Sequence, residues 1–281
     1  MTSVRTPRPA SPRGPFQGVL PWIFLLALLS PAEVLSQEPP TERMPEEPPR
    51  LRLDVDAWDA VPSGWIFITR GSQPGSATRA RDGHEVGLDP EVLPTGNARL
   101  RFWDSTDLGF RVVPVQESGT HTASGDFVYH GQTYAGGRQI RSDVGVLLLA
   151  LDVQRRWEAS DWLSLTPHLG AEYWGFSSHL RTVDGLAPID ERRSFSSGYW
   201  LAGADAEVRL TESLRGQVSC LGGLTGSSRY FIEAEAGMAL HLNSWASLTA
   251  TYRLQNLRFH TSTNEANLLF QGPAAGLELR F

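Results

Sequence analysis

The sequence contains few groups of residues whose types and spacing could form a catalytic site. It has no G-x-S-x-G or H-E-x-x-H motif and no glycine-rich phosphate loop of the P-loop or G-x-G-x-x-G type. Its single cysteine, Cys220, excludes an internal disulfide framework and a C-x-x-C zinc module, so we predict neither a metal nor a cofactor. One polar segment remains, residues 258–267 (R-F-H-T-S-T-N-E-A-N), in which His260 precedes Ser262. This segment is either a site or a polar loop tip that holds a histidine and a serine by chance.

The elements that would position these residues are predicted to be β-strands. Along residues 246–255, for example, alanine, leucine and tyrosine alternate with serine, threonine, arginine and glutamine. A period of two predicts a strand with two different faces, and segments of roughly ten such residues are typical of membrane β-barrels. A soluble secreted β-sandwich has the same alternation, so the pattern alone leaves both folds open.

The composition agrees with a β protein and argues against nucleic-acid binding. The 281 residues include 27 glycines and nine tryptophans but only three methionines, which suits a glycine- and aromatic-rich β protein better than a helical bundle. All 25 basic side chains are arginines, and 31 carboxylates outnumber them, for a formal net charge of −6. Because the chain carries no excess of positive charge, we expect no nucleic-acid partner.

The first 36 residues have the pattern of a secretory signal peptide. Arginines near the N-terminus precede an apolar core from Leu20 to Leu29, and a core of about ten residues is too short for a membrane-spanning helix. Small residues at Val34 and Ser36 allow cleavage before Gln37, and an uncleaved anchor is the alternative. Residues 37–50 are rich in proline and glutamate, which predicts an extended linker.

Two features of the remaining chain favour a membrane barrel. Aromatic residues lie near predicted strand ends, as the interfacial girdles of such barrels require; they are Trp157, Trp162, Tyr199, Trp200, Tyr230 and Trp245. The sequence also ends on an alternating strand, G-P-A-A-G-L-E-L-R-F, whose last residue is Phe281. This ending resembles the C-terminal assembly signal of Gram-negative outer-membrane β-barrel proteins. The resemblance implies that the barrel assembly machinery recognises Phe281 and that the protein reaches the outer membrane after signal-peptide-dependent export.

The strand pattern predicts an all-β fold, an antiparallel transmembrane β-barrel of eight strands within a range of eight to ten. An eighth strand is expected within residues 98–131, and the others are expected near residues 142–157, 162–177, 195–210, 214–223, 229–242, 245–260 and 266–281. The barrel domain is then 98–281, with external loops at 117–142 and 178–194 as contact surfaces. Residues 51–97 are expected to form an N-terminal extension that could add a strand near 64–70 or a plug. A split of the eighth strand near 104–107 would then give ten.

The inward face of this barrel would carry charged and amide side chains, namely His168, Glu172, Asp205, Glu207, Arg209, Arg215, Gln217, Glu233, Glu235, Arg253, Gln255, Glu278 and Arg280. Buried charges need partners, and side chains can fill the interior of an eight-stranded barrel. We therefore predict a closed, salt-bridged lumen in which His168 and Glu172 make a polar contact. A narrow selective channel lined by Glu233 and Glu235 is the alternative.

The F-H-T-S core of residues 259–262 resembles the F-x-H-x-S motif of lipid A 3-O-deacylases, which are eight-stranded outer-membrane barrels. The resemblance implies that His260 is the general base and Ser262 the nucleophile, both on the outer barrel surface. The family also has an acidic residue that orients the histidine, and the asparagine that follows the serine in that family stands one position later here. Two glutamates follow the motif, but neither matches that acidic residue. Glu265 is too close to His260 in sequence, and Glu278 should be lumenal.

These patterns predict a small, monomeric outer-membrane barrel with a closed lumen and a structural or surface-interaction role. Its expected partners are outer-membrane lipid and lipopolysaccharide. The alternatives are a lipid A 3-O-deacylase-like esterase that acts in the outer leaflet through His260 and Ser262, and the narrow channel. The non-enzymatic barrel is the favoured interpretation, since loops on a rigid scaffold are where recognition usually resides.

Overall fold

The computed structural model describes residues 50–70, 77–81, 87–103, 105–185, 188–225, 229–260 and 264–281. The predicted signal peptide at 1–36 and the predicted linker at 37–50 lie, apart from Arg50, outside the described residues. Every regular element in the described part of the chain is a β-strand, and no helix there is long and apolar enough to cross a membrane.

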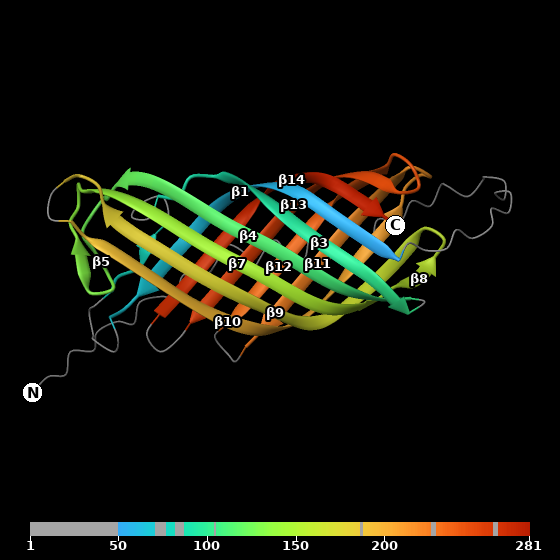
Figure 1. Cartoon of the computed structure of the whole chain (residues 1–281), viewed down its shortest axis with the longest axis horizontal. Coiled ribbons are helices and arrows are strands. Elements are labelled where there is room, and N and C mark those ends of the chain that lie inside the picture. Colours follow the sequence, from blue (N-terminus) through green and yellow to red (C-terminus); the bar gives the residue numbers. More distant parts are fainter. Residues whose placement is uncertain are drawn as a thin grey trace, which may run out of the picture. The chain divides into compact units, whose positions relative to one another are not determined.

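Ten antiparallel strands form a closed barrel (Figure 1). In order around the ring they are β1 (Leu51–Ile68), β3 (Glu91–Trp103), β4 (Thr106–Thr122), β7 (Gln139–Arg155), β9 (Leu163–Thr182), β10 (Asp190–Arg209), β11 (Leu214–Leu224), β12 (Tyr230–His241), β13 (Ala246–His260) and β14 (Asn264–Arg280). Pairing of β14 with β1, from Arg52 opposite Arg280 to Ile68 opposite Asn264, closes the ring. Each of these strands has two neighbours, so the ring has no free edge.

Four short strands lie outside the ring. β2 (Ala80–Arg81) pairs with β1, and β8 (Trp157–Ser160) pairs with β9. β5 (Phe127–Tyr129) and β6 (Gln132–Tyr134) form a hairpin within the connection between β4 and β7.

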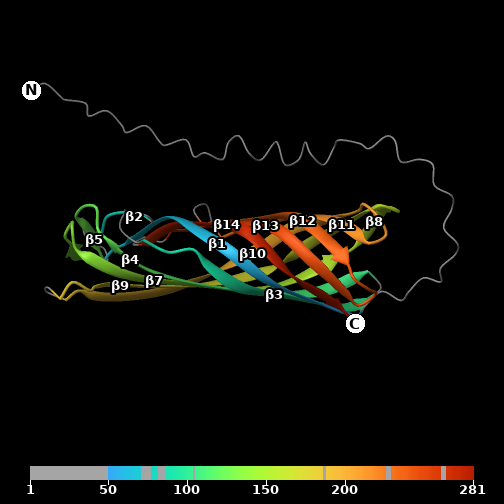
Figure 2. The ribbon, with the colours of Figure 1, turned by 90° about the horizontal axis from the view of Figure 1, so that it is seen from above.

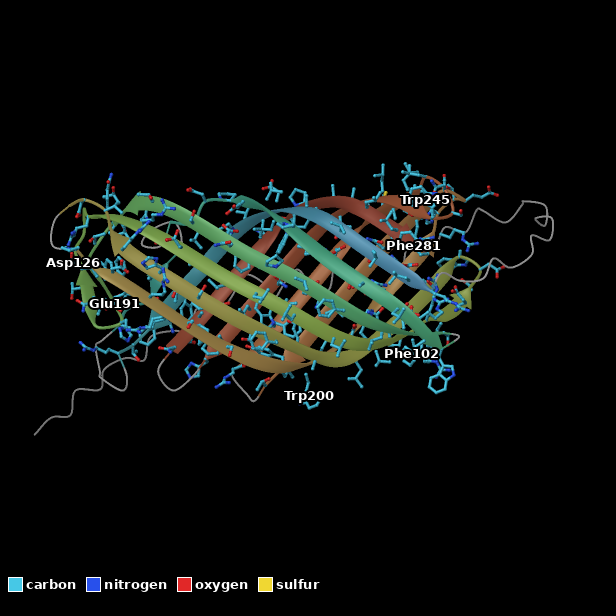
Figure 3. All side chains as sticks on the ribbon, in the orientation of Figure 1. Phe102, Asp126, Glu191, Trp200, Trp245 and Phe281 are labelled. Atoms are coloured by element: carbon cyan, nitrogen blue, oxygen red, sulfur yellow. The ribbon has the colours of Figure 1, made fainter. Side chains whose placement is uncertain are left out.

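The two ends of the barrel differ in their connections. One end, which we call the turn end, holds Leu51, Phe281 and short connections such as 210–213 and 242–245. The opposite end, which we call the loop end, carries the longer connections and the β5–β6 hairpin (Figure 2). Figure 3 shows Trp245 and Phe281 at the turn end and Asp126 at the loop end.

The prediction of eight strands is wrong, because the barrel has ten. The expected eighth strand at 98–131 divides at Trp103–Thr106 into β3 and β4, and residues 51–68 form a full barrel strand. The predicted extension at 51–97 therefore supplies β1 and most of β3. Its alternation is hard to recognise because the outward positions of β1 include Ala57 and Asp59 beside larger apolar residues.

The two faces of each long strand exchange polarity part-way along the barrel, as β9 illustrates. Toward the turn end, its inward side chains Ser164, Thr166, His168 and Glu172 are polar and buried, while outward residues such as Leu165, Leu169 and Tyr173 are apolar and exposed. Toward the loop end, the buried inward residues are Trp174, Phe176, Ser178 and Leu180, and the outward residues are Ser177, His179 and Arg181. The turn-end half therefore suits a lipid surrounding, and the loop-end half has the apolar core and polar surface of a water-soluble barrel.

Exposed apolar side chains surround the turn-end half and form what we call the apolar belt. Two of the most exposed are Leu169 at 68% and Trp200 at 78%, values that leave these side chains without cover from the rest of the protein. Other members include Val55, Leu100, Phe110, Leu147, Leu151, Ile232, Met238, Leu248 and Tyr252. A continuous apolar surface of this kind needs a lipid or detergent environment.

Candidate functional sites in the lumen and on the barrel wall

Ion pairs join opposite walls of the barrel in the polar, turn-end half of the lumen. Arg111 of β4 places Nη1 2.5 Å from Oε1 of Glu233 on β12, and Arg52 of β1 places Nη1 3.1 Å from Oε1 of Glu207 on β10. In each pair the two strands are five positions apart in the ring of ten, which is the full diameter. Side chains therefore span the lumen from wall to wall.

A histidine between two aspartates forms a second group in the lumen. Nδ1 of His168 lies 2.6 Å from Oδ2 of Asp152, and its Nε2 lies 3.0 Å from Oδ2 of Asp205. The predicted contact between His168 and Glu172 is wrong. The carboxylate of Glu172 instead accepts hydrogen bonds from Trp174 and from Arg111, the latter at 2.9 Å. Asp152 comes from β7, whose inward charge the sequence pattern did not reveal.

The two glutamates proposed as a channel lining are both paired. Glu233 contacts Arg111 and accepts a 3.0 Å hydrogen bond from Gln255, and Glu235 contacts Arg253 at 2.7 Å. A remaining cavity of about 100 Å³ lies among these charged side chains. Within the described ranges, no group of three histidine, cysteine or carboxylate side chains is placed to hold a metal ion.

Most residues predicted to be lumenal are buried inside the barrel. Those with less than a tenth of their surface exposed are His168, Glu172, Glu207, Arg215, Glu233, Arg253, Gln255 and Glu278. Arg209 is exposed at the turn end, contrary to the prediction. The prediction missed the inward charges of β1, which it assigned to the extension, and of the segment 98–131, whose two faces it did not assign; these charges are Arg52, Asp54, Asp56, Arg99 and Arg111. Recognition of β1, β3 and β4 would have revealed them, since they alternate with outward residues.

Apolar and aromatic side chains fill the loop-end half of the interior. Phe195 stacks between Phe176 and Phe259, with ring centroids 4.5 and 4.0 Å apart. Phe231 packs against Trp174 and, edge-on, against a ring from β10. These side chains come from strands all around the ring and are joined by Ile66, Val113, Val146, Leu148, Leu180, Tyr199, Leu257, Leu268 and Phe270. This aromatic layer packs across the interior between the lumenal ion pairs and the loop end.

The β5–β6 hairpin covers the loop end of the barrel. Its turn is His130–Gly131, and both residues have positive φ (48° and 78°), as a two-residue type I′ hairpin requires. The amide of His130 donates to the carbonyl of Ile68 on β1 at 2.8 Å, while Tyr129 Oη lies 2.5 Å from Ser178 Oγ on β9. Contacts to β1 and β9 hold the hairpin across the barrel mouth.

Burial and charge set the titration of this hairpin. Burial raises the pKa of Tyr129 to about 12 and also raises the pKa of Tyr134, so both phenols are neutral. Burial and the nearby Arg193 guanidinium lower the pKa of His130. A neutral His130 can accept the 2.5 Å hydrogen bond that Arg193 Nη2 donates to its Nδ1. The titratable side chains of the hairpin itself are therefore neutral at neutral pH.

On the outer wall, His260 projects outward as predicted and is exposed at the end of β13. Ser262 lies outside the described residues, so its position relative to His260 is not part of the described geometry. The hairpin between β13 and β14 brings Glu265 directly opposite His260 in the strand register, with Oε1 3.8 Å from Nδ1. Glu265 is closer in sequence to His260 than the family's acidic residue, but antiparallel pairing still places the two side by side.

Comparison with solved structures identifies the fold. The outer membrane protease OmpT from Escherichia coli superimposes with a TM-score of 0.54 at 8% identity, over 82% of this chain and 96% of that chain. The chain has the fold of an outer-membrane β-barrel. The transport unit of the autotransporter AIDA-I from Escherichia coli also matches, with a TM-score of 0.40 at 10% identity, over 86% of this chain and 93% of that chain. Ail of Yersinia pestis matches with a TM-score of 0.35 at 9% identity, over 81% of this chain and 99% of that chain.

These likenesses concern the fold alone. No protein-family model matches the sequence, and no curated protein matches it. The function of this outer-membrane-type barrel must therefore be argued from its own side chains.

Proposed function

We propose that this protein is an exported outer-membrane barrel with a closed lumen, and that it acts as a structural or surface-interaction element at the cell surface. In such barrels the short turns face the periplasm and the long loops face the exterior. By this orientation the turn end is periplasmic, and the loop end with the β5–β6 hairpin stands outside the membrane. The apolar belt supports the placement, since it surrounds only the turn-end half.

The observation that carries the proposal is the pairing of Arg111 with Glu233 across the full diameter of the lumen. Above these charges lies the aromatic layer, and above that layer lies the hairpin. An ion would have to displace all three to pass. The polar outer surface of the loop-end half, together with its loops, is then the part available for contact with partners.

Cell fractionation tests the location. The protein should partition with outer membranes and should change its gel mobility on heating, as folded barrels do. Cells that produce it should be no more sensitive to small hydrophilic antibiotics than cells that do not. Recovery of soluble protein from the periplasm after osmotic shock would contradict the proposal.

A second candidate function is an esterase that acts on lipid A in the outer leaflet. The observation that favours it is the outward pair of His260 and Glu265, which supplies an imidazole with an acidic neighbour. Glu265 is shared with Arg258 at 3.4 Å and Arg79 at 3.7 Å, so it does not serve the histidine alone. Mass spectrometry of lipid A decides between the two: loss of a 3-O-linked acyl chain that requires both His260 and Ser262 would establish the esterase, and an unchanged pattern would exclude it.

A further inference from the structure

A group of cationic and aromatic side chains lies on the outer wall of β13, β14 and β1, toward the loop end. We call this group, composed of Arg79, Arg258, His260, Glu265 and Trp65, the arginine patch. Arg258, Arg79 and His260 all approach the carboxylate of Glu265, at 3.4, 3.7 and 3.8 Å. One carboxylate therefore faces two guanidinium groups and an imidazole, and the patch keeps an excess of positive charge.

Strand register places the patch just beyond the apolar belt. Arg258 is paired with Tyr230 on one side and with Asn267 on the other, and Asn267 is paired with Trp65. Two rows closer to the turn end, the same face presents Ala234, Leu254, Gln271 and Val61. The step from Leu254 to Arg258 is four residues of one strand, about 13 Å along its axis. Outward tyrosines and tryptophans of membrane barrels lie at the level of the lipid headgroups. Arg258 lies between Tyr230 and Trp65 in the register, just beyond the apolar belt, so we place it at that level.

Both arginines of the patch have exposed side chains. The Arg258 side chain is 43% exposed, and the 3.4 Å contact with Glu265 is made by its Nη2. The Arg79 side chain is 58% exposed and lies over the Trp65 ring, 4.4 Å from the centroid, which fixes its guanidinium on the wall. Arginine donates in a planar fork that matches a phosphate group, so these donors suit phosphate oxygens.

The described residues of β10, on the opposite wall, do not show this combination. On β10 the outward residues that follow Trp200 toward the loop end are Gly198, Ser196 and Ser194, before Arg192 is reached. Outward arginines there, such as Arg192 and Arg141 on β7, lie farther from the aromatic positions of the belt and therefore serve as matched controls.

We propose that the arginine patch binds the phosphate groups of a phosphorylated glycolipid of the outer leaflet. The proposal rests on the orientation given under Proposed function, since it needs the loop end to face the exterior. The acyl chains would lie on the belt at Leu254 and Val61, and the phosphates would contact Arg258 and Arg79.

Native mass spectrometry of the folded barrel, released from vesicles of zwitterionic phospholipid with added lipid A, tests the proposal. The native protein should retain bisphosphorylated lipid A in preference to its dephosphorylated form. The variant Arg79→Gln/Arg258→Gln should lose about thirtyfold in retention, because each basic side chain near a charged membrane surface contributes roughly a factor of five. The control Arg141→Gln/Arg192→Gln should retain lipid A as the native protein does.

Several results would overturn the proposal. These are equal retention of dephosphorylated lipid A, native-like retention by the double variant, or an equal loss in the control. Displacement of lipid A by millimolar inorganic phosphate would show that the site binds free anions and not lipid.

The exposed single variant Arg79→Gln, which changes no residue of the ring, provides the test if the double variant does not fold. Heat-dependent gel mobility of each variant reports insertion separately, so a failed lipid site and a failed barrel are distinguishable.

Discussion

Arg111 and Glu233 face each other from opposite walls of the barrel, with Nη1 of the arginine 2.5 Å from Oε1 of the glutamate. The path around the ring from β4 to β12 passes through β3, β1, β14 and β13, so no longer separation exists in a ring of ten. The same guanidinium contacts Glu172 on β9 at 2.9 Å. One arginine thus joins three parts of the wall and pairs with two buried carboxylates.

Replacement of this arginine should destabilise the barrel strongly. Arg111→Ala leaves Glu172 and Glu233, which are 2% and 4% exposed, without their cation, and removal of one partner of a buried pair costs about 3–5 kcal/mol. The control Arg141→Ala removes an exposed pair with Asp143 and should cost about 0–1 kcal/mol. Urea titration of the free energy of unfolding in lipid vesicles measures both. Equal costs for the two variants would show that the cross-lumen pair does not hold the walls together.

The apolar belt predicts a position-dependent cost for charge on the outer wall. Leu169→Arg places a cation in the belt, where a lipid-facing arginine costs about 2–4 kcal/mol near the bilayer midplane. Ser177→Arg, on the same face of β9 but beyond the belt, should cost about 0–1 kcal/mol. The measurement is the free energy of unfolding from vesicles. If the two arginines cost the same, the polarity exchange along β9 does not mark the edge of the membrane.

Alkaline pH should release the β5–β6 hairpin. The pKa of Tyr129 is raised from its ordinary value near 10 to about 12, so the folded state holds the phenol proton more tightly than the unfolded state. Its contribution is therefore fully present below pH 10 and is lost as the pH rises to about 12. Limited proteolysis within 123–138 should accelerate over that window. Tyr129→Phe should show a smaller acceleration, and an acceleration equal to that of the native protein would refute the assignment to Tyr129.

Deletion of Phe281 separates folding from assembly. The Phe281 side chain is 62% exposed, and its backbone exchanges hydrogen bonds of 3.0 and 2.8 Å with Leu51. The deletion should cost at most about 1.5–3 kcal/mol and should leave refolding into detergent micelles intact. In cells, the predicted recognition of Phe281 by the assembly machinery implies little protein in the outer membrane. Phe281→Trp is the conservative control, and normal insertion of the deletion variant would contradict recognition of Phe281.

The sequence pattern predicted the turn-end half well and the loop-end half poorly. In the turn-end half, lipid outside and charge inside impose one alternation, so β9 to β14 were recognised near their true positions. In the loop-end half the alternation has the opposite sense, as at Trp174 and Ser177. The predicted loop 178–194 therefore wrongly includes the strand ends at 178–182 and 190–194. The contacts of Arg111 with Glu233 and of His260 with Glu265 depend on strand pairing, which cannot be read from the spacing of residues in the sequence.

Planar-bilayer recording of the purified native protein tests the closed lumen most directly. The cross-lumen pair of Arg111 and Glu233, the aromatic layer and the β5–β6 hairpin together predict a flat current trace at moderate voltage and neutral pH, with no discrete steps. Steady, ion-selective conductance steps from the native barrel would contradict the account and would favour the channel lined by Glu233 and Glu235.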